Sequence, residues 1–365
     1  MFSVKKISII TVGTIAIGLG SVKPVSAASL YAITGLDFLP SDINDSAQVV
    51  GQNYLWQNGN VTDLNTLPGA NNSNLFATAI NNNGAIIGGA SVSATTGQAA
   101  FISDGNTISD LPITACNNST FCSASVEDIN DSGTVAISYQ GRGFIQQSDG
   151  TTTQLLSARG VFNIAINNQD QVVGSAFFTG GSAVGLFSGN TTGRQTTLVA
   201  AAEPESFYRL TRSRANDIND AGAIVGSGLV STALSDSALE ETLWTNPSTR
   251  GVSLGTLGGE NSEAFGINNY QQIVGFSTLL DSSTRHAFLW EEGELTDLNS
   301  LIDSELGWEL TSALEINNNG DIIGIGNFNG EQRGFIATAV PEPTSVLGVL
   351  GLGLFGLSNW RKRKK

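Results

Sequence analysis

Four acidic residues stand directly before an Ile-Asn pair that recurs along this chain of 365 residues. They are Asp42, Asp128, Asp217 and Glu315. Two carboxyl groups that met in one cavity could act as general acid and base on a glycosidic bond, in a glycosidase or a lyase. These acids, however, recur in register with a repeat, and a repeated position is typical of a scaffold. The sequence therefore predicts no catalytic residue among them.

The same segments weakly resemble calcium-binding loops. The sequences DINDSG and DINDAG set Asp128 with Asn130, and Asp217 with Asn219, at alternate positions, where side-chain oxygens could surround a Ca²⁺ ion. Alanine or glycine replaces the first acid in three other copies, and no glutamate follows at the distance of a bidentate ligand. Hairpin turns are the favoured interpretation, with calcium as the alternative.

The single histidine, His286, is the other candidate for chemistry. Arginine occupies the corresponding place in other copies, as Arg142 and Arg333. Catalysis would need partnered groups in one pocket, and the sequence contains neither a nucleophile motif nor a phosphate-binding loop. We therefore expect a structural histidine and a protein that is not an enzyme and holds no cofactor.

Two cysteines, Cys116 and Cys122, lie close together in CNNSTFC. A disulfide that closes this short loop is plausible in an oxidising compartment. Two thiols without a nearby histidine cannot complete a tetrahedral metal shell. The pair is predicted to form a disulfide.

The Ile-Asn segment itself occurs seven times, each time followed by a turn and usually by two apolar residues and glycine. The copies start at Ile43, Ile80, Ile129, Ile166, Ile218, Ile267 and Ile316. A period of this size indicates an array of supersecondary units. In residues 262–301, short β-branched and aromatic runs alternate with turn residues, which predicts a four-stranded antiparallel meander. Ile-Asn would end the first strand, a two-residue turn would follow, and the glycine would let neighbouring units approach closely.

Six units show a fourth strand, and the last one runs from its third strand into Pro341. Residues 30–40 carry the missing fourth-strand pattern at the other end of the chain. An N-terminal strand that completes the last unit would close a ring and leave no exposed edge. We therefore predict an all-β fold, a seven-bladed β-propeller over residues 28–340. An open β-solenoid is the alternative.

The ends of the chain differ from this body. Residues 1–27 combine two lysines, an apolar run and Val25-Ser26-Ala27, the layout of a secretory signal peptide. At the other end, Pro341-Glu342-Pro343 precedes a short apolar stretch and five basic residues. Residues 28–343 have nine arginines and 32 acidic residues, a formal charge of −23. Such a charge disfavours nucleic acid and anionic lipid as partners.

Residues 341–365 resemble the PEP-CTERM sorting signal of Gram-negative bacteria: Pro-Glu-Pro, a short transmembrane helix and a basic tail. The resemblance implies that an exosortase, a membrane transpeptidase, cuts near Pro341-Glu342-Pro343 after transient anchoring in the inner membrane. The body would then reach the cell surface or extracellular matrix. An ordinary tail anchor is the alternative.

The repeats of residues 30–339 resemble the bacterial extracellular HAF repeat, whose tripeptide stands here as His286-Ala287-Phe288. Other copies depart from the tripeptide, so the array is degenerate. The HAF family has no firmly assigned activity. The resemblance therefore implies a compartment and a fold but no reaction.

Insertions gather in the loops that a propeller would place on one face, which usually marks the partner side of a repeat array. Aromatic and basic residues in these loops form the predicted ligand face; they are Phe207, Tyr208, Arg209, Arg212 and Trp308. Packing over the blade ends is the alternative role. We expect a non-catalytic binding or structural protein whose partner is an extracellular polysaccharide or a surface protein. An extracellular glycosidase or lyase with a carboxylate site in the channel is the competing class.

Overall fold

The computed structural model describes residues 31–70, 74–91, 98–113, 115, 124–155, 159–177, 184–190, 196–198, 214–228, 240–245, 251–280 and 283–340. They belong to one compact unit, Leu30–Val340. The signal-peptide and sorting segments and the Cys116–Cys122 pair lie outside the described residues. Within the described residues, no helix has the length and apolar character needed to cross a membrane.

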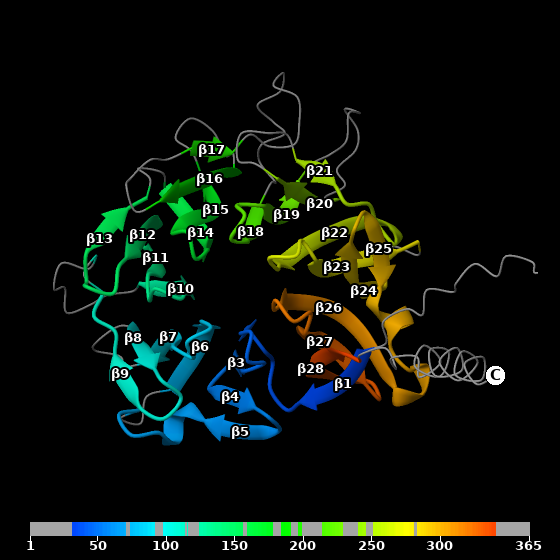
Figure 1. Ribbon diagram of the computed structural model, residues 1–365, viewed down its shortest axis with the longest axis horizontal. Helices are drawn as coiled ribbons and strands as arrows, with labels where there is room; N and C mark the ends of the chain where they lie inside the picture. Colours follow the sequence, from blue (N-terminus) through cyan, green and yellow to red (C-terminus); the bar gives the residue numbers. More distant parts are fainter. Residues whose placement is uncertain are drawn as a thin grey trace, which may run out of the picture. The chain divides into compact units, whose positions relative to one another are not determined.

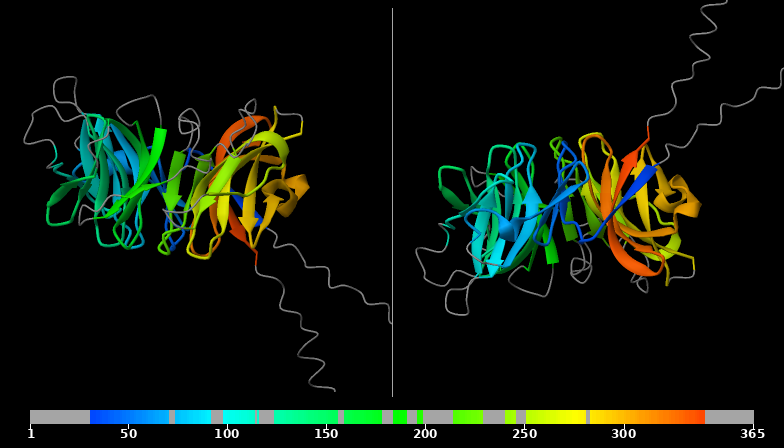
Figure 2. Two further views of the ribbon diagram at one scale, coloured as in Figure 1. Left: turned by 90° about the horizontal axis from the view of Figure 1, so that it is seen from above. Right: turned by 90° about the horizontal axis from the view of Figure 1, so that it is seen from below.

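The described strands form seven four-stranded antiparallel sheets, here called blades 1 to 7, arranged around a central channel (Figure 1). Viewed from the side, the blades form a flat ring (Figure 2). The fold is thus an all-β propeller, with one blade for each Ile-Asn copy in the sequence.

The strands of each blade follow one another from the channel outward. Blade 1 contains β2 (Asp42–Ile43), β3 (Val49–Gly51), β4 (Tyr54–Gln57) and β5 (Asn60–Asp63). Blade 2 contains β6 (Asn74–Ile80), β7 (Ile86–Ser91), β8 (Gln98–Ser103) and β9 (Ile108–Asp110). Blade 3 contains β10 (Ser125–Ile129), β11 (Val135–Tyr139), β12 (Arg142–Gln146) and β13 (Thr152–Gln154). Blade 4 contains β14 (Arg159–Ile166), β15 (Gln171–Phe177), β16 (Val184–Asn190) and β17 (Thr196–Leu198).

The remaining blades follow the same plan. Blade 5 contains β18 (Arg214–Ile218), β19 (Ile224–Gly228), β20 (Glu240–Trp244) and β21 (Val252–Ser253). Blade 6 contains β22 (Gly258–Ile267), β23 (Ile273–Leu279), β24 (Arg285–Glu291) and β25 (Glu294–Asp297). Blade 7 contains β26 (Trp308–Ile316), β27 (Ile322–Phe328), β28 (Glu331–Ala339) and, from the other end of the chain, β1 (Tyr31–Leu36). Short 3-10 helices lie at Leu64–Thr66, Leu298–Leu301 and Ser304–Leu306.

Strand β1 completes blade 7 by pairing antiparallel with β28. The register sets Tyr31 opposite Ala339, and Thr34 opposite Ile336. The predicted closure by an N-terminal strand is therefore present, and both ends of the described unit lie side by side in one blade (Figure 1).

The two apolar residues after each turn explain how the blades pack. In a strand, neighbouring side chains point to opposite faces of the sheet. In blade 1, Val49 packs with blade 7 and Val50 packs with blade 2, and both are fully buried. The same holds for the corresponding pair in every other blade, so seven apolar clusters fill the seven spaces between blades. A consecutive apolar pair is needed because each second strand is covered on both faces.

The glycine after this pair has a different role from the predicted one. A Cβ on Gly88 would collide with the backbone oxygen of Phe76, which lies in the adjacent strand of the same blade. At this place β6 carries a bulge, where the register shifts between Ala77 and Ala79. The glycine thus accommodates a bulge in its own sheet rather than the approach of a neighbouring blade.

The turn also differs from the predicted two-residue loop. Asn44 and Gln48 close the hairpin, since Asn44 N donates to Gln48 O over 3.1 Å, and three residues lie between them. The third of these, Ala47, has φ of 53°, and Gly84 holds the equivalent place with φ of 79°. This is a type I turn followed by one residue in the left-handed region, so the asparagine itself keeps an ordinary backbone.

Candidate functional site: the central channel

The asparagine of each Ile-Asn pair connects its own turn to the next blade. In blade 2, Asn81 Oδ1 accepts hydrogen bonds from the N–H groups of Asn83 (3.1 Å) and Ala85 (2.9 Å), while its Nδ2 donates to the carbonyl of Asn130 in blade 3 (2.9 Å). Such a side chain fixes a turn and satisfies a buried carbonyl at once. These seven asparagines are buried, with 3–5% exposure; they are Asn44, Asn81, Asn130, Asn167, Asn219, Asn268 and Asn317.

The amide hydrogen bonds run around the whole ring and return to their start. Each asparagine donates from Nδ2 to the backbone oxygen of the next, over 2.8–3.1 Å. The last of them joins Asn317 in blade 7 to Asn44 in blade 1, at 3.0 Å. An open solenoid has no contact between its first and last repeats, so the closed ring excludes that alternative.

A second polar ring lies one residue further along each turn. The N–H of Asp45 donates to Asn82 Oδ1 (2.8 Å), and the N–H of Asn82 donates in turn to Asp131 Oδ1 (2.8 Å). The pattern continues to Asn318, whose N–H donates to Asp45 Oδ1 over 2.8 Å. Aspartate and asparagine both fit this position because each provides the accepting oxygen.

The four acids before Ile-Asn form a third ring, and the structure brings them together in the channel. Asp42 Oδ1 accepts from its neighbour Ile43 N and Oδ2 accepts from Ile80 N of blade 2, both at 2.7 Å. Asp128 and Asp217 repeat this arrangement with blades 4 and 6. Each aspartate thus ties its own blade to the following one, whose equivalent residue is alanine or glycine.

Burial in this ring favours the uncharged form of the acids. It raises the pKa of Asp128 to about 6 and that of Asp217 to about 7, against the lowering effect of their backbone hydrogen bonds. For Asp42 and Glu315, burial and the neighbouring carboxylates raise the pKa well above its usual range. Groups of this kind occur both in active sites and in structural networks.

The channel contains a cavity of about 160 Å³ near the Ile-Asn turns. Among the described residues that line it are Asp42, Asp128 and Asp217 with the two polar rings, and none is Lys, Arg or His. The described residues hold no group of three or more His, Cys, Asp or Glu placed to bind a metal ion.

The side-chain oxygens of the four residues considered as calcium ligands accept hydrogen bonds from backbone N–H groups. Asn130 Oδ1 accepts from Ser132 N and Thr134 N, and Asn219 Oδ1 accepts from Ala223 N. Asp128 and Asp217 accept the backbone N–H groups described above. These residues therefore serve as turn and interblade acceptors in this structure.

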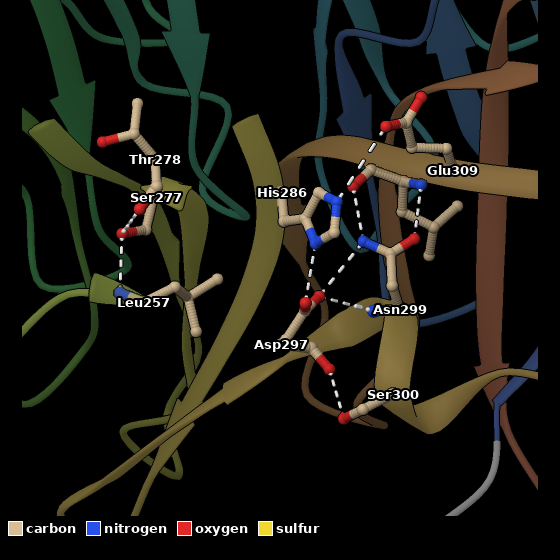
Figure 3. A network of polar contacts seen from close by, with 9 residues as sticks. Leu257, Ser277, Thr278, His286, Asp297, Asn299, Ser300 and Glu309 are labelled. Carbon is tan, nitrogen blue, oxygen red and sulfur yellow. Dashed lines mark hydrogen bonds and ion pairs between the residues drawn. The ribbon is translucent and has the colours of Figure 1, made fainter. Parts of the chain in front are cut away.

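His286 is not among the residues that line the channel cavity; it lies in a network between blades 6 and 7 (Figure 3). Its Nδ1 contacts Asp297 Oδ2 at 2.6 Å, and its Nε2 lies 3.9 Å from Glu309 Oε1. Asp297 also accepts from Asn299 N, and Asn299 exchanges two hydrogen bonds with the backbone of Leu310 in blade 7 (2.7 and 2.9 Å). The network joins the outer strand of one blade to the inner strand of the next.

The hydrogen-bond network around Asp297 and Asn299 was not predicted, although a repeated tetrapeptide in the sequence could have indicated it. The segment Thr-Asp-Leu-Asn occurs at residues 62–65 and again at 296–299. In blade 1, Asp63 accepts from Asn65 N (2.9 Å), and Asn65 Oδ1 accepts from Leu75 N of blade 2 (3.0 Å). The repetition of both contacts identifies the motif as an interblade connector.

Of the five residues of the predicted ligand face, Trp308 is the one that lies within the described part of the chain. Phe207, Tyr208, Arg209 and Arg212 lie outside the described residues. Trp308 is partly buried, and its ring lies 5.1 Å from the ring of Phe328 and 6.3 Å, edge-on, from that of Phe335. These contacts fit the alternative role, packing within blade 7, and the assignment of Trp308 to a ligand face stays a prediction.

Comparison with known proteins supports both the fold and the C-terminal signal. Residues 339–364 match the model of the PEP-CTERM protein-sorting motif. This motif implies export, sorting to the cell surface and processing by an exosortase. The comparison with curated proteins gave no match.

Among solved structures, the chain is similar to the β-propeller domain of the Trilobed protease from Pyrococcus furiosus. The TM-score is 0.51 at 10% identity, over 73% of this chain and 83% of that one. That domain is described as having an open velcro topology. Dipeptidyl peptidase 4 of Porphyromonas gingivalis has a TM-score of 0.45 at 8% identity, over 82% of this chain and 53% of the peptidase. At such identities the likeness concerns the fold.

Proposed function

We propose that this chain is an exported, non-catalytic seven-bladed propeller, closed by its N-terminal strand, that an exosortase releases or transfers to the surface or extracellular matrix of a Gram-negative bacterium. The sorting motif at residues 339–364, which begins at the last residue of β28, is the observation that carries this proposal. The net negative body favours a neutral or cationic partner outside the cell, and an extracellular polysaccharide is our candidate.

The hydrogen bonds of the channel support a scaffold rather than an active site. Both oxygens of Asp42, Asp128 and Asp217 already accept backbone N–H groups of two blades. These contacts fix the three carboxyl groups between neighbouring blades, which gives them a structural role. The raised pKa of these acids is what favours the second candidate, an extracellular glycosidase or lyase.

Binding of the purified mature protein to polysaccharide from its own host tests the first candidate. We expect Tyr208→Ala to weaken binding at least tenfold, because Tyr208 belongs to the inserted loops. Tyr270→Ala is the matched control: Tyr270 is 73% exposed and lies in the turn that follows Ile267-Asn268. Equal loss in both variants, or cleavage of the polysaccharide by the wild type, would contradict the proposal.

A further inference from the structure

Three of the four acids in the channel ring accept backbone N–H groups from two blades each, and the fourth, Glu315, does not. Asp42, Asp128 and Asp217 each accept the N–H of their own following isoleucine and that of the next blade. The three aspartates therefore connect blades 1 and 2, 3 and 4, and 5 and 6. Because the number of blades is odd, blade 7 has no partner blade in this pattern. Glu315 of blade 7 would be next to reach into blade 1, where Ile43 N already donates to Asp42.

The side chain of Glu315 turns toward blade 6 instead. A Cβ placed on Gly266 would lie 2.6 Å from Glu315 Oε2, so the carboxyl group occupies the space that the missing side chain leaves. The equivalent residues of blades 2 and 4 are Ala79 and Ala165. Among the described residues, no hydrogen-bond donor reaches the Glu315 carboxyl group.

The charged groups around Glu315 are almost all acidic. Asp42, Asp128 and Asp217 share its ring and act on it electrostatically. Further acids on the packed elements are Glu127 of β10, Glu263 of β22, Asp321 after β26, and Asp45, Asp131 and Asp220 of the second polar ring. The basic groups on these elements have other partners: Arg214 is exposed and lies 3.8 Å from Glu263, while Arg285 and His286 of β24 contact the Phe276 ring and Asp297. No described basic side chain lines the channel to balance a charge on Glu315.

We propose that Glu315, the member of the acid ring that no described hydrogen-bond donor reaches, is a proton-binding residue of this propeller. It is uncharged in the closed ring, and its ionisation as the pH rises weakens the packing of blade 7 against its neighbours. The protein would therefore be most stable at mildly acid pH and would loosen at alkaline pH outside the cell.

The direction of the effect follows from linkage. Burial, and then the carboxylates of Asp217, Asp42 and Asp128, raise the pKa of Glu315 well above its usual value of 4.5. The folded state thus keeps a proton that the unfolded state releases. This contribution to stability is complete below pH 4.5 and is lost as the pH rises through the folded-state pKa.

Denaturant unfolding of the mature exported protein between pH 5 and pH 8 tests the proposal. The unfolding equilibrium constant of the wild type should rise over this range, and the rise should be at least tenfold smaller in Glu315→Gln, since one pKa unit corresponds to a tenfold change. At pH 8 the variant should be more stable than the wild type. Glu305→Gln, at an exposed residue of the 3-10 helix Ser304–Leu306, is the matched control and should behave as the wild type.

An equal rise in the wild type and in Glu315→Gln, or a wild type that gains stability from pH 5 to pH 8, would overturn the proposal. If Glu315→Gln fails to fold, infrared spectroscopy of Asp42→Asn decides, because this variant lacks the other carboxyl group whose pKa is raised well above its usual range. The signal of a protonated carboxyl group should persist at pH 7.5, where Asp128 and Asp217 have largely ionised at their pKa values of about 6 and about 7. Its absence at that pH would also overturn the proposal.

Discussion

A single asparagine side chain in each blade connects the turn to the ring. The oxygen of Asn219 accepts from Ala223 N at 2.9 Å, and its Nδ2 donates to Asn268 O at 3.1 Å. Both partners are buried, so neither can turn to water when the side chain is removed. The Ile-Asn motif is thereby explained at the level of individual atoms.

Asn219→Ala should lower the free energy of unfolding by about 1–3 kcal/mol, because it leaves the buried N–H of Ala223 unsatisfied and removes one of the two hydrogen bonds that Asn268 O accepts. Urea unfolding followed by circular dichroism measures this. Asn106→Ala, at an exposed turn in blade 2, is the control and should change stability by less than about 0.5 kcal/mol. Similar values for the two variants would show that the amide ring does not contribute to stability.

Trp308→Ala should also destabilise the protein, by about 2 kcal/mol or more, because the ring packs on Phe328 and Phe335. Differential scanning calorimetry should show a lower melting temperature, while Tyr270→Ala leaves it unchanged. An unchanged melting temperature for Trp308→Ala would contradict the packing role and favour the ligand-face role for this residue.

Sequence reasoning identified the channel acids but could not assign their roles. Asp42, Asp128 and Asp217 were recognised as repeated, which suggested a scaffold. The N–H groups that they bind belong to residues 38–50 positions further along the chain, and no local pattern reveals such partners. The packing of Trp308 was not predictable for a related reason: Phe335 contacts it from another strand, and Gly35 lies against it from a strand near the other end of the chain.

At the scale of the elements, the second strand of each blade is the centre of the packing. Its two apolar residues face the preceding and the following blade, so one short strand belongs to two cores. The strands could be predicted from the sequence because turn residues flank the short apolar runs on both sides. The bulges of the first strands could not be predicted, because they depend on the register between paired strands.

Ile323→Ala, in β27, should lower the free energy of unfolding by about 2–5 kcal/mol, since this residue is fully buried between blades 7 and 1. Val61→Ala, at a strand position that is 54% exposed, should have little effect on it. Guanidinium unfolding of the two variants measures the difference. Equal stabilities would mean that the space between blades 7 and 1 is not a tightly packed core.

At the scale of the whole molecule, the first and last strands of the propeller, β1 and β28, close the ring. β1 pairs with β28 over six residue pairs, and the asparagine ring continues from blade 7 to blade 1. The sequence predicted this closure because one terminal unit lacked a strand and the other end supplied it. The register, which sets Thr34 opposite Ile336, could not be read from the sequence pattern.

Deletion of residues 30–39 should expose the edge of β28 and remove Leu36 and Phe38 from the core between blades 7 and 1. An unpaired edge strand is a template for association with other chains. We expect a broader unfolding transition and aggregation, as measured by calorimetry and by size-exclusion chromatography with light scattering. A deletion variant that stays monomeric and melts as the wild type does would contradict closure by β1.

Export and exosortase processing of this propeller form the central claim, and intact-mass spectrometry of the protein recovered from the cell surface or the medium tests it most directly. The account predicts a body that begins near residue 28 and ends near Pro343, without the basic residues Arg361–Lys365. Surface protein with an intact C-terminus ending at Lys365 would contradict the claim.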